Sequence, residues 1–286
     1  MTQAQSRFES NAVSFASGLG FIEGPVWDDS AQTLSVVSIN HGCVYVMDRD
    51  GSKVQSVEVG GGPNGLVLSR SGLLVAQNGG IFGASGPAQP GVQRIVDGRV
   101  DYVLGKGFLA PNDLAFGPDG RLYVTDPATD RALTEPTEGR LLACDLKTGE
   151  CEVIADGRLF PNGLAFEADG QHLLLAQTYT RVIERLHRSS TGWVSDGTFC
   201  NLVNGRPDGM AIDEEGNLWI CTPGTGGVEI FDRRGVFVQR IELGAGTMTT
   251  NICFGGEERC DVFITAAGIG TVLTLKTDVP GLLLLK

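Results

Sequence analysis

A short phrase recurs four times along this 286-residue chain: a proline, an asparagine or aspartate, a glycine or aspartate, and then an apolar run. Its copies begin at Pro63, Pro111, Pro161 and Pro207, so successive prolines are 48, 50 and 46 residues apart. Each copy leads through a polar turn into a second apolar run, for example residues 217–221. Self-similarity at such a period indicates a repeat architecture, in which each unit packs against the next.

Two weaker copies complete the series. Residues 23–27 lead into the apolar run 34–37, and residues 250–254 lead into 261–265. Each unit also has a third apolar run and usually a fourth, and the glycine-containing turns between them are typical of β-hairpins. Six units of four antiparallel strands predict an all-β, six-bladed β-propeller, which we expect to occupy residues 1–286 as a single domain.

The last of the six units has no visible fourth strand. We predict that Ala12, Val13, Ser14 and Phe15 supply it from the other end of the chain. Such a strand closes the ring, because an open ring leaves two unpaired sheet edges.

The composition narrows the range of partners. A formal net charge of −12 argues against nucleic acid, whose binding depends on Lys and Arg neutralising phosphates. No segment approaches the roughly 20 apolar residues of a membrane span, and the N-terminus is polar. The seven cysteines form no CxxC pair. We therefore expect a cytoplasmic protein that acts on a small molecule, with a monomer as the default assembly.

Oxygen-bearing side chains occupy one position of the repeat. In a propeller the first strand of each blade lines the central tunnel, so residues at the start of that strand meet at one mouth. The six units place there Glu23, Asn64, Asn112, Asn162, Asp208 and Asn251. Asparagine or aspartate before glycine also serves simply to form turns. Two carboxylates and four amides aimed at one axis nevertheless favour a bound cation.

The residue types constrain the cation. Only three histidines are present, and of these His41 alone is expected to be able to reach the mouth. Without a histidine cluster or a cysteine pair, zinc and copper are disfavoured. We expect one divalent cation that prefers oxygen ligands, and the residues do not separate Ca²⁺, Mg²⁺ and Mn²⁺.

Several phrases occur together in the order of a known family. They read GFIEGPVW from residue 20, PNDL from 111, YVTDP from 123, PNGL from 161, PDGM from 207 and TNICFGG from 250. From about residue 15 to 267 the chain resembles the regucalcin (senescence marker protein)/gluconolactonase/luciferin-regenerating enzyme family. The resemblance implies a metal-dependent lactonase or related esterase.

The resemblance also implies roles for individual residues. The positions matching Glu23, Asn162 and Asp208 bind the cation, and the position matching Asn112 binds either the metal or the substrate. Asp208 is the expected general base, and Asn112 is expected to assist the reaction. The remaining predicted substrate contacts are Asn64, Ala110, Asp126 and Asn251.

Two departures from the family pattern bear on the substrate. Residues 107–110 read Gly-Phe-Leu-Ala, where sugar-lactone members often have arginine and asparagine that meet substrate hydroxyls. Residues 128–130 replace a frequent aromatic-glycine pair. Both changes favour a less hydroxylated substrate than a gluconate-type lactone.

Two other functions stay open at this point. The same metal site suits a phosphotriesterase-like enzyme or another ester or cyclic-amide hydrolase. Alternatively, the chain is a non-catalytic propeller that binds calcium. The glycine-rich insertion 79–91 is long enough for a lid over the mouth, although a surface loop is an equal alternative.

Overall fold

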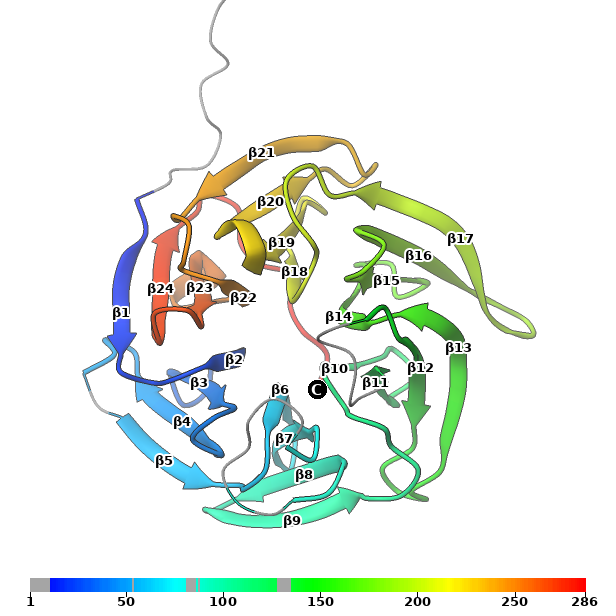
Figure 1. The fold of residues 1–286 in the computed structure, drawn as a ribbon, viewed down its shortest axis with the longest axis horizontal. Coiled ribbons are helices and arrows are strands. Elements are labelled where there is room, and N and C mark those ends of the chain that lie inside the picture. Colours follow the sequence, from blue (N-terminus) through cyan, green and yellow to red (C-terminus); the bar gives the residue numbers. More distant parts are fainter. Residues whose placement is uncertain (1–10, 53, 81–85, 87, 128–134) are drawn as a thin grey trace, which may run out of the picture.

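The computed structural model describes residues 11–286 except 53, 81–85, 87 and 128–134. Six four-stranded antiparallel sheets are arranged around a central axis, as Figure 1 shows. The predicted six-bladed β-propeller is therefore confirmed.

Within each blade the strands follow chain order from the axis outwards. Blade 1 contains β2 (Ile22–Asp28), β3 (Thr33–Ser38), β4 (Cys43–Asp48) and β5 (Val54–Glu58). Blade 2 contains β6 (Pro63–Ser69), β7 (Gly72–Gln77), β8 (Gly91–Val96) and β9 (Arg99–Leu104). Blade 3 contains β10 (Leu114–Phe116), β11 (Leu122–Pro127), β12 (Glu138–Cys144) and β13 (Cys151–Leu159).

The second half of the chain repeats this order. Blade 4 contains β14 (Pro161–Phe166), β15 (His172–Gln177), β16 (Val182–Ser189) and β17 (Gly192–Asn201). Blade 5 contains β18 (Met210–Ile212), β19 (Leu218–Thr222), β20 (Gly227–Phe231) and β21 (Phe237–Glu242). Blade 6 contains β22 (Thr249–Gly255), β23 (Asp261–Ala266) and β24 (Thr271–Lys276).

The fourth strand of blade 6 comes from the N-terminal region. β1 (Val13–Ser17) pairs antiparallel with β24, with Val13 opposite Thr274. In Figure 1 the blue strand β1 therefore lies beside the red strand β24. The predicted ring closure is confirmed, and the pairing removes an open edge from the sheet.

Apolar side chains between neighbouring blades hold the ring together. One cluster joins blades 2 and 3 and includes the fully buried Ala76, Val92, Leu122 and Val124. Removing a valine or leucine side chain of this cluster from water contributes roughly 1.5–3 kcal/mol, although the conformational entropy of the chain opposes this. The packing leaves the inner strands little freedom, so residues at their starts have defined positions at the tunnel mouth.

Two other features concern cysteines and helices. Cys144 and Cys151 form a disulfide across the β12–β13 hairpin, a pairing that the sequence analysis did not anticipate. The described residues include two short 3-10 helices, η1 (Pro223–Thr225) and η2 (Glu257–Arg259). Within the described ranges, no helix has the length and apolar character needed to cross a membrane.

Candidate functional site

The starts of the inner strands bring oxygen-bearing side chains to one level of the tunnel, which we call the ring. Equivalent backbone bonds define this level, since the N–H groups of Asn112 and Asp208 donate to the carbonyls of Thr125 and Cys221 in the adjacent strands. The ring residues, one from each blade, are Glu23, Asn64, Asn112, Asn162, Asp208 and Thr250. Five of the six predicted residues therefore lie where the sequence placed them.

Glycines one position after the ring let the blades approach closely. A Cβ atom on Gly65 would lie 2.6 Å from the carbonyl oxygen of Asn112, and one on Gly163 would lie 2.5 Å from that of Asp208. Real Cβ atoms do not approach backbone atoms so closely, so these positions require glycine. The repeated Asn/Asp-Gly pair thus has two roles, a polar ring and tight contact between blades.

The sixth ring position differs from the prediction. Asn251 pairs with Thr265 in β23, and its N–H donates to the Thr265 hydroxyl at 2.8 Å. Asp113 has the same arrangement with Thr125, at 2.9 Å. Asn251 therefore lies one level below the ring, which we call the second tier, and Thr250 takes the ring position. The same irregularity occurs in β2, β6 and β14, so it does not set Asn251 apart. The register follows from the apolar run 252–254, which corresponds to residues 114–116 and places Asn251 level with Asp113.

Asp113 is a buried carboxylate that the sequence analysis missed. It occupies the second tier of blade 3, where three other copies of the phrase have glycine. Its carboxylate accepts hydrogen bonds from the N–H groups of Leu114, at 2.8 Å, and Leu164. Burial nevertheless raises the pKa of Asp113 to about 7. The available signal was the replacement of glycine by aspartate in one copy only.

Interactions among the acids show that they converge. The pKa of Glu23 is raised well above its ordinary value by burial, then by the negative charges of Asp208 and Asp113, while hydrogen bonds from the Gly24 N–H and the Asn251 amide oppose this. Burial likewise raises the pKa of Asp208 to about 8, with a further contribution from Asp113, against a hydrogen bond from Asn162. Three carboxyl groups from blades 1, 3 and 5 thus share one poorly solvated space.

The donor set fits a hard divalent cation. Three mutually repelling carboxyl groups are uncompensated in the described tunnel, and a cation relieves that repulsion. The amide N–H groups of Asn162 donate hydrogen bonds to Thr178 Oγ1, at 3.2 Å, and to the Asp208 carboxylate. The amide carbonyl oxygen of Asn162 is therefore available to a cation. The carboxylate and amide oxygens that Ca²⁺, Mg²⁺ or Mn²⁺ accept are offered by Glu23, Asn162 and Asp208, with Asn112 from blade 3.

Two predicted substrate contacts are buried under the mouth. The Asp126 side chain has no exposed surface and accepts hydrogen bonds from the N–H groups of Leu109 and Ala110 and from Arg140. Ala110 is 3% exposed. These hydrogen bonds give Asp126 a structural role, whereas contact of Asp126 or Ala110 with the substrate stays a prediction. Asp126 shapes the loop at the mouth, in which the side chains of Lys106 and Leu109 are exposed.

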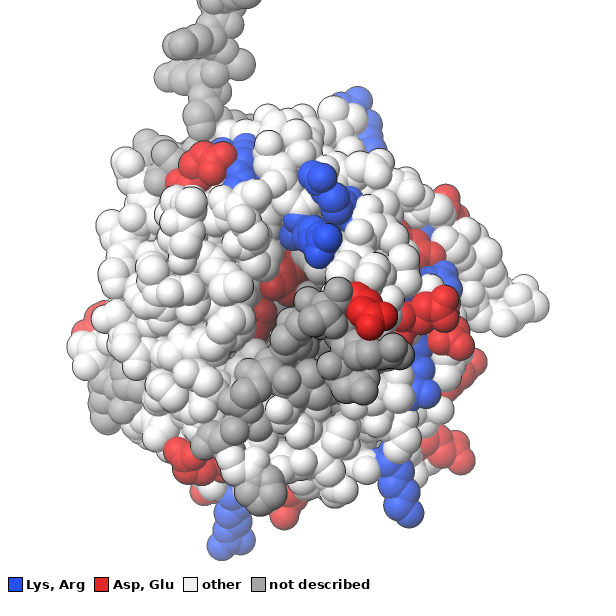
Figure 2. Space-filling model, viewed as in Figure 1, with Lys and Arg blue, Asp and Glu red and all other residues white. Residues whose placement is uncertain are grey.

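Three other features were singled out in the sequence: His41, the insertion 79–91 and residues 128–130. His41, in the β3–β4 turn, is exposed, and its Nδ1 lies 2.9 Å from the Tyr45 hydroxyl. Six of the thirteen residues of the insertion 79–91, namely 81–85 and 87, and the whole of 128–130 lie outside the described residues, so the predicted lid stays untested. Figure 2 shows acidic side chains at the bottom of a central hollow, with Lys and Arg side chains along one side of its rim.

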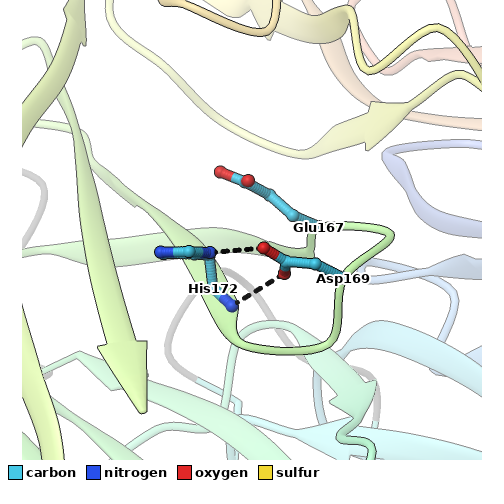
Figure 3. Close-up of side chains that lie close together, drawn as sticks. All are labelled: Glu167, Asp169 and His172. Carbon is cyan, nitrogen blue, oxygen red and sulfur yellow. Dashed lines mark hydrogen bonds and ion pairs between the residues drawn. The ribbon is translucent and has the colours of Figure 1, made fainter. Parts of the chain in front are cut away.

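A second acidic group lies at the opposite end of β14 from Asn162. The ligand atoms of Glu167, Asp169 and His172 lie within 4.8 Å of one another (Figure 3). Arg185 already binds Glu167 through two hydrogen bonds of 2.8 and 2.7 Å, and Asp169 lies 2.6 Å from His172 Nδ1. These internal ion pairs account for the group, so the ring is the better metal candidate.

Below the second tier the tunnel widens into an apolar cavity of about 370 Å³. Asp113 and Asn251 lie in its lining, together with apolar residues of the inner strands. Residues 282–285 near the C-terminus, all leucine, line it as well, and the Leu282 N–H donates to the Ile212 carbonyl. The end of the chain thus borders the tunnel on the side away from the ring.

Known structures share this architecture. The structure superposes on a putative gluconolactonase with a TM-score of 0.79 and 22% identity, covering 97% of this chain and 96% of the other. It superposes on a calcium-binding protein, regucalcin, from Agrobacterium tumefaciens with a TM-score of 0.78 and 19% identity, at the same coverages. At such identities the likeness shows the fold alone.

Sequence matches extend the likeness beyond the fold. Regucalcin of Xenopus laevis is 30% identical over 254 residues, covering 86% of this chain and 82% of the relative. Gluconolactonase of Zymomonas mobilis is 28% identical over 284 residues, covering 88% and 78%. The family model described as the SMP-30/Gluconolactonase/LRE-like region matches residues 21–268. The protein is therefore a member of the SMP-30/gluconolactonase/LRE-like family.

Proposed function

We propose that the ring binds one divalent cation and that the protein hydrolyses a lactone at this site. The observation that carries the proposal is the convergence of Glu23, Asp208 and Asp113 on one buried space beside Asn162. Scaffold propellers have no need of three uncompensated acids on the axis. A relative named gluconolactonase supports the choice of a lactone, and a structural neighbour named as calcium-binding supports the cation.

A cation held by Glu23, Asn162 and Asp208 would supply Lewis-acid polarisation of the lactone carbonyl and acidify an attacking water. Asp208 is suited to take the proton from that water at its carboxylate. Once the hydroxyl has added to the acyl carbon and the ring C–O bond breaks, Asp208 returns the proton to the departing oxygen. The water is thereby consumed and a hydroxy acid released.

The amides of the ring would orient the reactants. Asn112 lies in the ring two blades from Asp208, and its amide N–H could stabilise negative charge that develops on the carbonyl oxygen. Asn64, in the neighbouring blade, is 4% exposed and is placed to bind the substrate or the water. Because the loop over Asp126 presents Leu109 at the mouth, a substrate with few hydroxyls fits better than a sugar lactone.

The test is a pH-indicator assay on metal-stripped protein, using aliphatic, aromatic and sugar lactones with Ca²⁺, Mg²⁺ or Mn²⁺ added singly. Turnover should require a cation and fall about 10²–10⁴-fold in Asp208→Asn. Asp169→Asn, which removes a carboxylate at the opposite end of the blade, is the matched control and should retain activity. Full activity in Asp208→Asn would remove Asp208 from the mechanism.

The same assay separates the competing functions. Hydrolysis of phosphotriesters such as paraoxon without any lactone turnover would indicate a different hydrolase on the same site. Cation binding by calorimetry without turnover of any substrate would indicate a calcium-binding propeller, the function that the name of one structural neighbour suggests.

A further inference from the structure

One exposed arginine at the tunnel mouth, Arg206, forms no ion pair with any residue that the structure describes. Its guanidinium carbon lies 5.0 Å from the centroid of the Tyr179 ring. Two less exposed arginines of the later blades are neutralised: Arg158 pairs with Glu184, and Arg240 with Glu229 and Glu242. Some exposed arginines elsewhere also lack an ion pair, but Arg206 differs from them in its position, over an aromatic ring and two residues before Asp208.

Neighbouring groups hold this guanidinium in place. The Tyr179 ring beneath it makes an edge contact with Phe160, at 5.9 Å between centroids, and Phe160 directly precedes the Pro161–Asn162 pair. Arg181 donates hydrogen bonds to the carbonyls of Gly205, at 2.9 Å, and Val203, at 3.1 Å. These bonds fix the backbone of the loop that leads to Arg206. The cation of Arg206 is thus ordered before any ligand arrives.

Hydrogen bonds connect this arginine to the ring. Thr178 Oγ1 donates to the carbonyl of Pro207 at 2.9 Å and accepts from Asn162 Nδ2 at 3.2 Å. Asn162 in turn donates to Asp208. The Cα atoms of Arg206 and Asp208 are two residues apart, which is at most about 7 Å of chain. A small molecule can therefore touch the ring and the guanidinium together.

We propose that Arg206 is a specificity-determining residue that binds a carboxylate on the substrate, so that the substrate class is small lactones bearing a carboxylate. This inference rests on the proposed lactonase function. The planar guanidinium matches a carboxylate through two parallel N–H···O bonds. The acidic floor repels anions in general, so an anionic substrate requires a fixed cation beside the ring. A lactone that is recognised through its carboxylate also agrees with residues 107–110, which lack the arginine and asparagine that meet substrate hydroxyls in sugar-lactone members of the family.

The test uses two lactones of the same shape that differ in charge, 5-oxotetrahydrofuran-2-carboxylate and the corresponding carboxamide. We expect the wild type to prefer the carboxylate in kcat/KM at least 10-fold, chiefly through a lower KM. Arg206→Gln should abolish this preference while leaving turnover of the carboxamide within about twofold, and Arg206→Lys should restore part of it. Arg234→Gln is the matched control, because Arg234 is 74% exposed, pairs with Asp232 and lies in the β20–β21 turn at the far end of blade 5.

The outcomes distinguish the two proposals. Turnover of the carboxamide with no preference for the carboxylate, or an equal loss on both lactones in Arg206→Gln, would overturn the role of Arg206 and leave the lactonase proposal standing. If neither these nor other lactones are opened, the lactonase proposal fails. Calorimetry with 2-hydroxyglutarate, the ring-opened product, then still tests Arg206, which requires binding by the wild type and its loss in Arg206→Gln. Equal binding by both proteins would overturn it.

Discussion

Asp113 and Asn251 occupy equivalent positions in opposite blades of the propeller. Each side chain accepts a hydrogen bond of 2.8 Å from the N–H of the following residue, and each backbone N–H donates to a threonine hydroxyl of the adjacent strand. One of the pair is an acid and the other an amide that donates to Glu23. The second tier thus adds one charge beneath the ring and one donor that orients a ring carboxylate.

Replacing Asp113 with asparagine and Asn251 with aspartate should change the Tm of the metal-free protein in opposite directions. Asp113→Asn keeps the acceptor for the Leu114 N–H and removes a buried charge, so we expect a higher Tm at pH 8. Asn251→Asp adds a charge beside Glu23 and loses a donor, so we expect a lower Tm. Thermal unfolding with and without Ca²⁺ measures both. Equal shifts in the same direction would show that the second tier is electrostatically separate from the ring.

Cation affinity should depend on Glu23. Glu23→Gln preserves the size of the side chain and removes one of the negative ligands, so we expect the Kd for Ca²⁺ in calorimetry to rise at least 10-fold. Asp169→Asn should leave Kd unchanged, because Asp169 bonds His172 at the other end of blade 4. Unaltered Ca²⁺ binding in Glu23→Gln would place the cation elsewhere.

The metal-free protein should become less stable as the pH rises from about 4 to about 8. The pKa of Asp113 is about 7 and that of Asp208 about 8 in the folded protein, whereas an unfolded aspartate titrates near 3.9. Over this window the folded state holds more protons than the unfolded state, so the free energy of unfolding falls with rising pH.

Denaturant titrations at pH 5, 6, 7 and 8 measure this loss of stability. The slope should be shallower in Asp208→Asn. Saturating Ca²⁺ should remove most of the loss by pH 8, because the cation binds the deprotonated acids. A metal-free protein whose stability rises over the window would contradict the burial of these groups.

The C-terminal leucines should contribute to stability and leave the chemistry at the ring intact. Deleting residues 282–286 removes the Leu282–Ile212 backbone bond and uncovers the apolar cavity. We expect stronger binding of a hydrophobic dye and a Tm lower by several degrees. Lactone turnover at 25 °C should stay within about threefold, since the ring lies above the second tier. If the truncated protein folds but loses all turnover, the C-terminal end of the tunnel must affect the chemistry at the ring, which would contradict this prediction.

The sequence indicated the propeller because its evidence is local and repeated six times. Four of the six units combine a proline-asparagine or proline-aspartate phrase with short apolar runs, and two weaker copies complete the series. Recognising the period of about 48 residues needs no knowledge of long-range contacts. The departures from the repeat were equally readable. Glu23 and Asp208 stand where most copies have asparagine, and the structure brings both carboxyl groups together.

The tertiary structure decided which residues near the mouth are covered and which charges meet. The level of Asn251, one residue below the predicted one, could have been read from the sequence, because residues 252–254 correspond to 114–116. Asp126 follows a strand much as a substrate-binding residue would, yet the chain folds residues 109–110 over it. Likewise, Arg206 matters because of what lies around it: Tyr179 comes from another blade, and no described acid reaches it.

This chain by itself therefore determined which residue types face the axis and how many blades carry them, because both follow from period and alternation. Which of those residues are exposed to a ligand, which meet at the axis and which charges lack a partner depended on contacts between segments far apart in the sequence. The hydrophobic pattern of a strand sets its own register, but it does not specify which side chains of other blades lie beside it.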